Sequence, residues 1–274
     1  MPMKLNEQKS VAIAGLGSIG FNVAGHLIRG IPGYQLVAAS DTNEALARQR
    51  LDDLGSDVPL CSLGELSKCA DIIIECLPVV AFAGVADTVV EEGKILIPLS
   101  AAALLERMDL IDRAKQTGAR ILMPSGALLA FDAVRAAAEG EIQSVRMTTR
   151  KPPHTLAGAP YIEENRISLD DVREPLRVFS GSARLGAKGF PANVNVAAAL
   201  SLAGIGPDRT MIEIWADPTV TRNTHEIEVE ADSARFSMRI ESVPSLENAR
   251  TGKFTPLSVV ALLRGLNATF RIGS

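Results

Sequence analysis

The first half of the chain alternates short apolar runs with longer amphipathic or polar segments. The apolar runs, which predict strands, cover residues 11–16, 36–41, 71–78, 94–100 and 119–124. The segments between them predict a helix directly after the first strand, and further helices over residues 43–54, 79–91 and 104–117. Strands that are apolar on both sides are typical of a parallel sheet whose two faces are covered by helices. We therefore expect a Rossmann-type, doubly wound α/β domain over residues 1–124.

Near residue 140 the pattern changes to an alternation of apolar and polar residues, which is typical of antiparallel strands with one buried and one open face. Such stretches lie at 144–151, 210–217, 224–231 and 234–242, and apolar helices are predicted at 193–204 and 257–266. We expect an α+β catalytic domain with a mainly antiparallel sheet over residues 125–253. Its open face would receive a substrate or a dimer partner. The C-terminal helix, within residues 254–274, is expected to pack back on the first domain.

The sequence VAIAGLGSIG, residues 11–20, places three glycines between the first strand and the first helix. Gly15 suits a tight turn, Gly17 lets the backbone approach a pyrophosphate, and Gly20 lets the helix pack on the strand. The start of the helix, with Ser18 and Ile19, offers N–H groups and a partial positive charge to the anion. The pattern predicts a dinucleotide site. The alternative is a tight strand-to-helix turn that binds no nucleotide.

Asp41 ends the second strand 21 residues after Gly20 (41 − 20), where a carboxylate would accept hydrogen bonds from the adenosine ribose. We expect Asp41 to favour NAD over NADP, because a carboxylate repels a 2′-phosphate. Arg48 and Arg50 in the following helix could soften this preference by offering a counter-charge. Ligands of such sheets bind beyond the carboxyl ends of the strands. This rule adds residues 75–78, with Leu77 and Pro78 as predicted cofactor contacts, and residues 100–103 and 124–127.

The composition favours small soluble partners. The 274 residues include 28 Lys and Arg against 32 Asp and Glu, a net charge of −4, without a basic run, so neither nucleic acid nor a membrane surface is expected as a partner. The longest apolar run, 95–105, is too short to span a bilayer. Cys61, Cys69 and Cys76 lack disulfide or metal-site spacing, and we expect buried free thiols. The protein is expected to be cytoplasmic.

Several motifs of the second half lie outside what a generic α/β pattern predicts: SGALLAFDA at 125–133, TTRKPP at 148–153, FSGSAR at 179–184, FPANVNVAAALSLAG at 190–204, ADPTVTRNTHEI at 216–227 and PSLENARTG at 244–252. Together with the glycine motif, this set resembles the L-aspartate dehydrogenase family over nearly the whole chain. The resemblance implies NAD(P)-linked oxidation of L-aspartate to iminosuccinate, which hydrolyses to oxaloacetate and ammonia, and the reverse reaction. We also expect a homodimer. The sequence departs from the one common in the family at Leu246, Ala249, Lys253 and Phe254, and these differences bear on substrate choice.

The resemblance assigns the catalytic histidine to His225. An unperturbed imidazole has a pKa of about 6.5 and can move protons near neutrality. In a strand, Asn223, His225 and Ile227 would share one face and Glu226 would lie on the other. We therefore expect Asn223, a predicted substrate contact, to be the neighbour of the imidazole. The alternative is a surface histidine or one packed in the core.

The remaining site predictions concern the backbone near the cofactor and the carboxylates of the substrate. The resemblance places cofactor contacts at Ala127 and Asn195, and Asn195 is also a predicted substrate contact. Strand alternation directs only one of Arg150 and Lys151 inward, and Lys151, the position that matches the family, is the predicted substrate contact. Ser125 is expected to begin and cap a helix while contacting the substrate.

Two other histidines and two rival functions remain. His26 is expected to be a packed helical residue, and His154 lies in a segment that could approach the substrate. No spacing of histidines or cysteines predicts a metal site. The first rival function is a related amino-acid dehydrogenase or imine reductase with another substrate. The second is a nucleotide-sensing protein that has lost catalysis.

Overall fold

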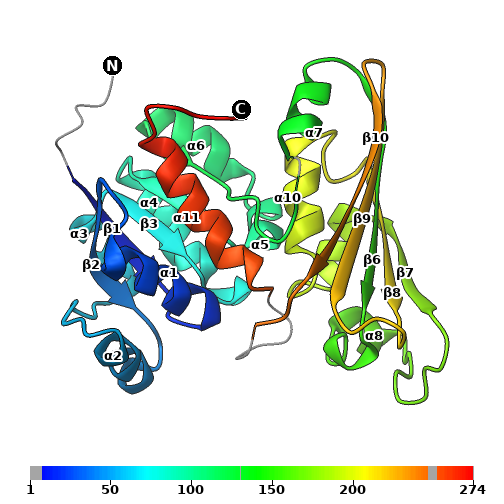
Figure 1. Cartoon of the computed structure of the whole chain (residues 1–274), viewed down its shortest axis with the longest axis horizontal. Helices are drawn as coiled ribbons and strands as arrows, with labels where there is room; N and C mark the ends of the chain where they lie inside the picture. The colour runs from blue at the N-terminus through cyan, green and yellow to red at the C-terminus, as the bar shows by residue number, and fades with distance from the viewer. Residues whose placement is uncertain (1–7, 130, 246–251, 274) are drawn as a thin grey trace. The chain divides into compact units, whose positions relative to one another are not determined.

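The computed structural model describes residues 8–129, 131–245 and 252–273, and the chain forms two compact units (Figure 1). Unit 1 comprises Met1–Gly126 with Thr255–Ile272, and unit 2 comprises Ala127–Phe254 with Gly273–Ser274. Each unit contains one five-stranded sheet, called here sheet A in unit 1 and sheet B in unit 2. None of the helices in the described part of the chain is long and apolar enough to cross a membrane.

Sheet A is parallel throughout, with the order β2-β1-β3-β4-β5. Its strands are β1 (Lys9–Ala14), β2 (Tyr34–Ser40), β3 (Ile72–Glu75), β4 (Ile95–Pro98) and β5 (Arg120–Ile121). The chain moves from β1 outward to β2, and then returns to place β3 on the other side of β1. This confirms the predicted doubly wound sheet and puts its topological switch point between β1 and β3.

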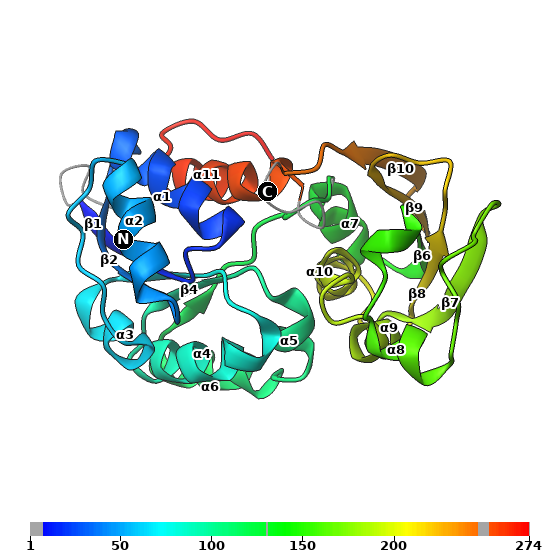
Figure 2. The same ribbon diagram turned by 90° about the horizontal axis from the view of Figure 1, so that it is seen from below.

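Helices cover both faces of sheet A (Figure 2). Helices α1 and α11 lie on one face, where Val259 and Leu263 of α11 join Val23 and Leu27 of α1 in the buried core. Helices α3, α4 and α6 lie on the other face. The helices of unit 1 are α1 (Ser18–Gly30), α2 (Glu44–Asp53), α3 (Leu66–Cys69), α4 (Phe82–Glu91), α5 (Ala101–Leu105), α6 (Asp109–Thr117) and α11 (Phe254–Leu266), with 3-10 turns at Leu63–Glu65 and Val79–Ala81.

Two local predictions for unit 1 were wrong. The single helix expected over 104–117 is divided into α5 and α6 by a turn, in which the side chain of Arg107 bonds Asp87 of α4 at 2.9 and 2.7 Å and Asp109 at 3.0 Å. All three cysteines were expected to be buried, but Cys69 is exposed at the end of α3, where Leu66 and Ser67 take the buried positions, and Cys61 and Cys76 are half-buried.

Sheet B has the order β10-β9-β6-β8-β7, in which only β6 and β8 are parallel neighbours. This confirms the mainly antiparallel second sheet. Its strands are β6 (Ile142–Lys151), β7 (Leu176–Ser182), β8 (Thr210–Ala216), β9 (Asn223–Ala231) and β10 (Arg235–Ser242). Strand β7, which contains part of the FSGSAR motif, was not among the predicted strands. The helices of unit 2 are α7 (Phe131–Ala138), α8 (Pro160–Glu164), α9 (Ala183–Gly189) and α10 (Asn195–Ala203), with a 3-10 turn at Pro153–Thr155.

Sheet B has one face on a hydrophobic core. Along β6, Val145, Met147, Thr149 and Lys151 are buried, whereas the residues between them are partly or fully exposed. Helices α7 and α10 lie along the buried face (Figure 1), and α9 contacts β7 and β8. The opposite face is polar, as the alternation predicted, and β9 exposes Glu226, Glu228 and Glu230 there.

The start of the SGAL segment also differs from the prediction. Ser125 does not begin a helix, because Gly126 adopts a left-handed φ of 62° and its N–H donates to Ser258 Oγ at 3.1 Å. The residues after it form a turn, and α7 begins only at Phe131. Ser125 is therefore not an N-cap. The predicted departures Leu246 and Ala249 lie outside the described residues.

Candidate active site

The glycine loop joins β1 to α1 at the carboxyl edge of sheet A. Gly15 has φ +92°, and a Cβ there would lie 2.7 Å from the carbonyl oxygen of Cys76. A Cβ on Gly20 would lie 1.9 Å from the carbonyl oxygen of Gly15, whereas one on Gly17 would meet no atom within 4 Å. Gly17 is the N-cap of α1 and supplies no side-chain cap. The loop thus leaves open space at the N-terminus of a 13-residue helix, beside Ser18 and Ile19, which fits a pyrophosphate.

Asp41 is attached to this loop from the end of β2. Its carboxylate accepts hydrogen bonds from the backbone N–H of Leu16 at 2.7 Å and of Asn43 at 3.0 Å. The guanidinium of Arg50 donates to the carbonyl of Leu16 and lies 5.4 Å from the ring centre of Phe21. Asp41, whose carboxylate suits a ribose diol, and Arg50, whose guanidinium suits a phosphate, therefore both bond Leu16 of the glycine loop.

The loop after β3 completes this edge. Leu77 approaches the glycine loop, since its Cδ2 would lie 3.2 Å from a Cβ on Gly15, and Pro78 beside it is exposed. Glu75, the last residue of β3, is fully buried. The structure thus brings together the predicted contacts of unit 1 along one edge, namely Gly15, Gly17, Ser18, Ile19, Gly20, Asp41, Leu77 and Pro78.

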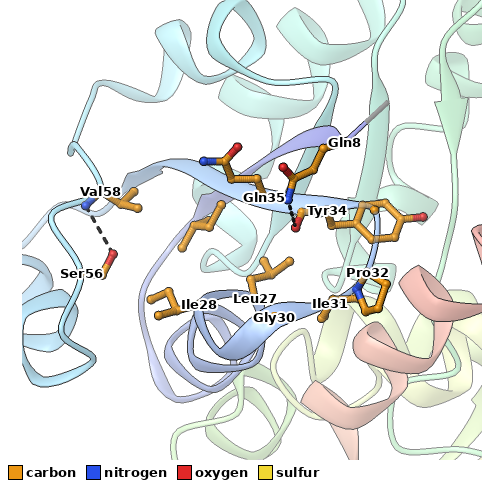
Figure 3. A pocket seen from close by; sticks show the side chains of 12 residues that line it. Gln8, Leu27, Ile28, Gly30, Ile31, Pro32, Tyr34, Gln35, Ser56 and Val58 are labelled. Carbon is orange, nitrogen blue, oxygen red and sulfur yellow. Dashed lines mark hydrogen bonds between the residues drawn. The ribbon is translucent and has the colours of Figure 1, made fainter. Parts of the chain in front are cut away.

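A groove of about 530 Å³ lies elsewhere in unit 1 (Figure 3). It is lined by the end of α1, the start of β2 and the segment near Val58, with Leu27, Ile31 and Tyr34 among its walls. Tyr34 opens β2, whereas Asp41 follows its end, so the groove lies at the amino edge of the sheet. It is separate from the glycine loop.

Unit 2 contains a buried polar cluster on the inner face of sheet B. Thr149 of β6 lies directly opposite His225 of β9, and its Oγ1 is 3.1 Å from His225 Nδ1. Two residues further along β6, Lys151 Nζ donates to Asn193 Oδ1 at 3.0 Å. His225 is 4% exposed and Lys151 is 3% exposed. A cation, an imidazole and two neutral polar groups thus share one desolvated region.

The surroundings of His225 determine its protonation. Burial, together with the smaller effect of the positive charge of Lys151, lowers the pKa of His225 to about 3. The imidazole is therefore neutral near pH 7. A neutral imidazole has one nitrogen that can accept a proton. The hydrogen bond between Nδ1 and the Thr149 hydroxyl fixes the orientation of the ring.

The strand positions agree with the alternation expected from the sequence. Asn223 and His225 are buried and Glu226 is exposed. Lys151 points into unit 2, whereas Arg150 stacks at 4.8 Å from the ring centre of Trp215 and pairs with Asp217 at 3.2 Å. The ring bond seen for His225 is to Thr149 and not to Asn223, which was the neighbour expected from the sequence.

The other predicted residues have different settings. Ala127 lies in the turn after Gly126, and Asn195 is the first residue of α10. Ser125 precedes that turn and is partly exposed. His26 lies within α1, and His154 is exposed in the 3-10 turn after β6. The assigned roles of Ser125, Ala127 and Asn195 remain predictions.

The sequence reasoning missed Thr149 and Asn193. Thr149 carries a detectable signal, because it lies two residues before Lys151 in an alternating strand and so shares its face. Asn193 is the first asparagine of the FPANVNVA motif, of which only the second, Asn195, was assigned a role. The hydrogen bonds to His225 and Lys151 distinguish both residues as parts of the site.

Comparison with known proteins supports both units. Residues 15–124 match the family model described as homoserine dehydrogenase, NAD binding domain, and residues 132–266 match aspartate dehydrogenase, C-terminal. The first match covers the glycine loop and Asp41, whose geometry fits a dinucleotide. The cofactor is NAD.

Near full-length relatives carry one name. The chain is 52% identical to the L-aspartate dehydrogenase of Bradyrhizobium diazoefficiens, over 96% of this chain and 94% of that protein. It is 48% identical to L-aspartate dehydrogenase 3 of Bordetella bronchiseptica, over 99% of this chain and 100% of that protein. The crystal structure of aspartate dehydrogenase from Thermotoga maritima shares the fold, with a TM-score of 0.75 at 23% identity, over 97% of this chain and 99% of that one. The chain belongs to the L-aspartate dehydrogenase family.

Proposed function

We propose that the protein oxidises L-aspartate to iminosuccinate, which hydrolyses to oxaloacetate and ammonia, and that it also catalyses the reverse reductive amination. The observation that carries this proposal is the buried contact between Thr149 and His225 beside Lys151, in a chain whose near full-length relatives are named L-aspartate dehydrogenase. A cation and a neutral base in one desolvated region suit a substrate that brings two carboxylates and an amine.

The two units have different roles in this proposal. Unit 1 is the dinucleotide-binding domain, and the predicted cofactor contacts are Gly15, Gly17, Ser18, Ile19, Gly20, Asp41, Leu77 and Pro78, with Ala127 and Asn195 from unit 2. Unit 2 is the catalytic domain, and the predicted substrate contacts are Lys151, Asn195, Asn223 and His225, with Ser125 from unit 1. NAD supplies, when bound, the two-electron acceptor for oxidation of the amine.

His225 is the group that moves protons. As a neutral imidazole it can take a proton from the substrate amine, release it to solvent, and then take another from the water that adds to the imine carbon. Its low pKa in the free protein makes it a weak base. A dicarboxylate bound nearby would raise this pKa, because negative charge favours the imidazolium. Substrate binding would therefore strengthen the base at the time when it is needed.

Lys151 and Asn223 bind and orient the substrate. The ammonium of Lys151 is held by Asn193 Oδ1 and buried, so its attraction for a carboxylate is weakly screened. Asn223 lies on the same strand face as His225 and supplies an amide in reach of that face. Over the whole reaction, aspartate, NAD+ and water give oxaloacetate, ammonium, NADH and a proton.

The first prediction concerns the choice of cofactor. The unmodified protein should use NAD better than NADP, because Asp41 accepts bonds from a ribose diol and repels a 2′-phosphate. Asp41→Ala should narrow the ratio of kcat/KM for NAD over NADP by about tenfold, which corresponds to one charge-assisted hydrogen bond. Steady-state kinetics with both cofactors measures this ratio.

Arg50→Ala is the matched control, since Arg50 donates to the carbonyl of Leu16, the residue whose N–H donates to Asp41. It should reduce the use of NADP more than that of NAD. Equal or better use of NADP by the unmodified protein would show that Asp41 does not set the preference.

The second prediction concerns His225. His225→Ala should lower turnover by about 100- to 10,000-fold, the range for a positioned general acid or base. NAD affinity, measured by titration, should change little. Thr149→Val removes the hydroxyl that bonds Nδ1 while keeping a similar volume, and should lower kcat about tenfold and displace its pH profile.

His154→Ala is the control for the loss of an imidazole, because His154 is exposed and should leave turnover unchanged. If His225→Ala kept most of the activity, the histidine would be structural. If the variant also lost NAD binding, misfolding would explain the result instead.

The third prediction concerns the substrate. L-Aspartate should be preferred to alanine by roughly 10,000-fold or more in kcat/KM, because alanine leaves buried donors unpaired. Glutamate should also be poor, because one extra methylene displaces its carboxylate. NADH formation with each amino acid, and NADH consumption with oxaloacetate and ammonia, measures both directions. Comparable rates with alanine or glutamate would favour another substrate, and the absence of turnover with all three would favour an imine reductase or a nucleotide sensor.

The fourth prediction concerns the assembly, for which we propose a cytoplasmic homodimer formed by the open face of sheet B. Met211 is 44% exposed on this face, which also presents an acidic row on β9, Glu226, Glu228 and Glu230, beside a basic row on β10, Arg235 and Arg239. Within one copy the rows meet in the pair of Arg235 with Glu230 at 3.2 Å. A two-fold axis would set the acidic row of one copy against the basic row of the other.

Met211→Glu should raise the dimer dissociation constant by about 30-fold. In sedimentation measurements Leu185→Glu, on α9 at the covered face, should stay dimeric, and a monomeric unmodified protein would refute the assembly.

A further inference from the structure

Glu75, the last residue of β3, is a fully buried acid at the carboxyl edge of sheet A. One oxygen of its carboxylate accepts hydrogen bonds from the N–H of Leu77 at 2.8 Å and from Ser100 Oγ at 2.9 Å. The other accepts from the N–H of Leu99 at 3.2 Å and of Ser100 at 3.1 Å. All four donors come from the two loops that follow β3 and β4.

These bonds join the two loops to the glycine loop. Ser100 Oγ also lies 3.1 Å from the carbonyl of Leu77, so the same hydroxyl connects both loops. Cys76, between Glu75 and Leu77, donates its N–H to the carbonyl of Ala14 at 2.8 Å, and its own carbonyl closely approaches Gly15. The position of the Glu75 carboxylate therefore determines the backbone path along this edge.

The Glu75 carboxyl lacks a cationic partner among residues 8–129, 131–245 and 252–273, and the four hydrogen bonds that it accepts favour its ionised form. Burial raises its pKa, and the hydrogen bonds from Leu77, Ser100 and Leu99 act against this effect. The titratable group against it is the Cys76 thiol, whose pKa is raised by burial and by Glu75 itself. Asp87 of α4 shows the ordinary arrangement, since two arginines accompany its carboxylate. Burying a carboxylate without a cation is unfavourable, and the four hydrogen bonds to Glu75 offset only part of that cost.

The strand order indicates which part of the cofactor binds near Glu75. A dinucleotide lies across the switch point of a doubly wound sheet. Asp41, which suits the adenosine ribose, follows β2 on one side of β1, so the nicotinamide half belongs on the side of β3 and β4. The oxidised nicotinamide ring carries a positive charge, which the reduced ring lacks.

We propose that Glu75 is a positioning residue for the nicotinamide half of NAD: its carboxylate fixes the loops after β3 and β4, and its uncompensated charge favours the oxidised ring. This inference rests on the dinucleotide site proposed for unit 1 and gives a role to Glu75, which lies in the predicted segment 75–78 but was not among the individual predicted contacts. It connects a buried charge to the redox state of the cofactor. A structural role alone would treat NAD and NADH equally.

The test is a direct titration of NAD and of NADH into Glu75→Gln, with thermal unfolding measured in parallel. Glutamine keeps the size and removes the charge, but its amide NH2 also loses the hydrogen bonds that one carboxylate oxygen accepts. The loss of these bonds should raise the dissociation constant for NADH by about threefold or less, and the added loss of the charge should raise that for NAD by about tenfold. Glu75→Asp keeps the charge, but it is one methylene too short to reach both loops. It should weaken NAD and NADH by similar factors.

Asp71→Asn is the matched control at the other end of the same strand. Asp71 accepts bonds from the N–H and the Oγ of Ser10 at 3.1 and 2.7 Å, so its loss should lower the unfolding temperature without changing either dissociation constant. Unchanged affinities in Glu75→Gln would falsify the proposal, and equal weakening of NAD and NADH would overturn the role of the charge. If Glu75→Gln does not fold, the Glu75→Asp variant decides: dissociation constants for NAD and NADH equal to those of the unmodified protein would overturn the positioning role. Failure of the unmodified protein to bind NAD would instead overturn the proposed dinucleotide site.

Discussion

Strand register is the constraint on which both parts of the candidate site depend. In sheet A, Ala14 of β1 lies beside Glu75 of β3, and Glu75 lies beside Pro98 of β4, so three strands end on one line. The loops that follow therefore meet at a single edge. In sheet B, Thr149 lies opposite His225 in the same way. A slip of one residue would turn His225 to the polar face that Glu226 now occupies, because side chains alternate along a strand.

The register brings polar groups into regions from which water is excluded, and this changes their chemistry. His225 is neutral at pH 7 because burial and Lys151 oppose its protonation. At the surface the same side chain would be partly charged near neutrality. The hydrogen bonds of Thr149 and Asn193 limit the penalty of burying the imidazole and the ammonium, since a buried polar group with a partner is far less unfavourable than one without. The supporting residues are thus part of the site.

Local patterns in the sequence predicted much of this arrangement. The glycine spacing and Asp41 are local to one strand-turn-helix-strand unit, and alternation along one strand separated Lys151 from Arg150. The contacts that were missed join distant segments: Thr149 and His225 are 76 residues apart, and Lys151 and Asn193 are 42 apart. The turn between α5 and α6 contains another such contact, the bond from Arg107 to Asp87, 20 residues earlier. Periodicity assigns a residue to a face, whereas the pairing of strands and helices decides which side chains meet there.

The two units hold charges of opposite sign in comparable settings. Unit 1 buries the carboxylate of Glu75 at the sheet edge that suits a dinucleotide, and unit 2 buries the ammonium of Lys151 beside a neutral base. Oxidation of an amino acid by NAD removes the positive charge of the nicotinamide ring, while the substrate keeps its two carboxylates. In the proposed roles, the buried anion is matched to the oxidised cofactor, and the buried cation is matched to the dicarboxylate throughout the reaction. Because neither charge is well screened by water, each would act most strongly on the molecule that displaces the remaining solvent. Electrostatic complementarity of this kind would select both reactants by charge, before the finer contacts discriminate between similar amino acids.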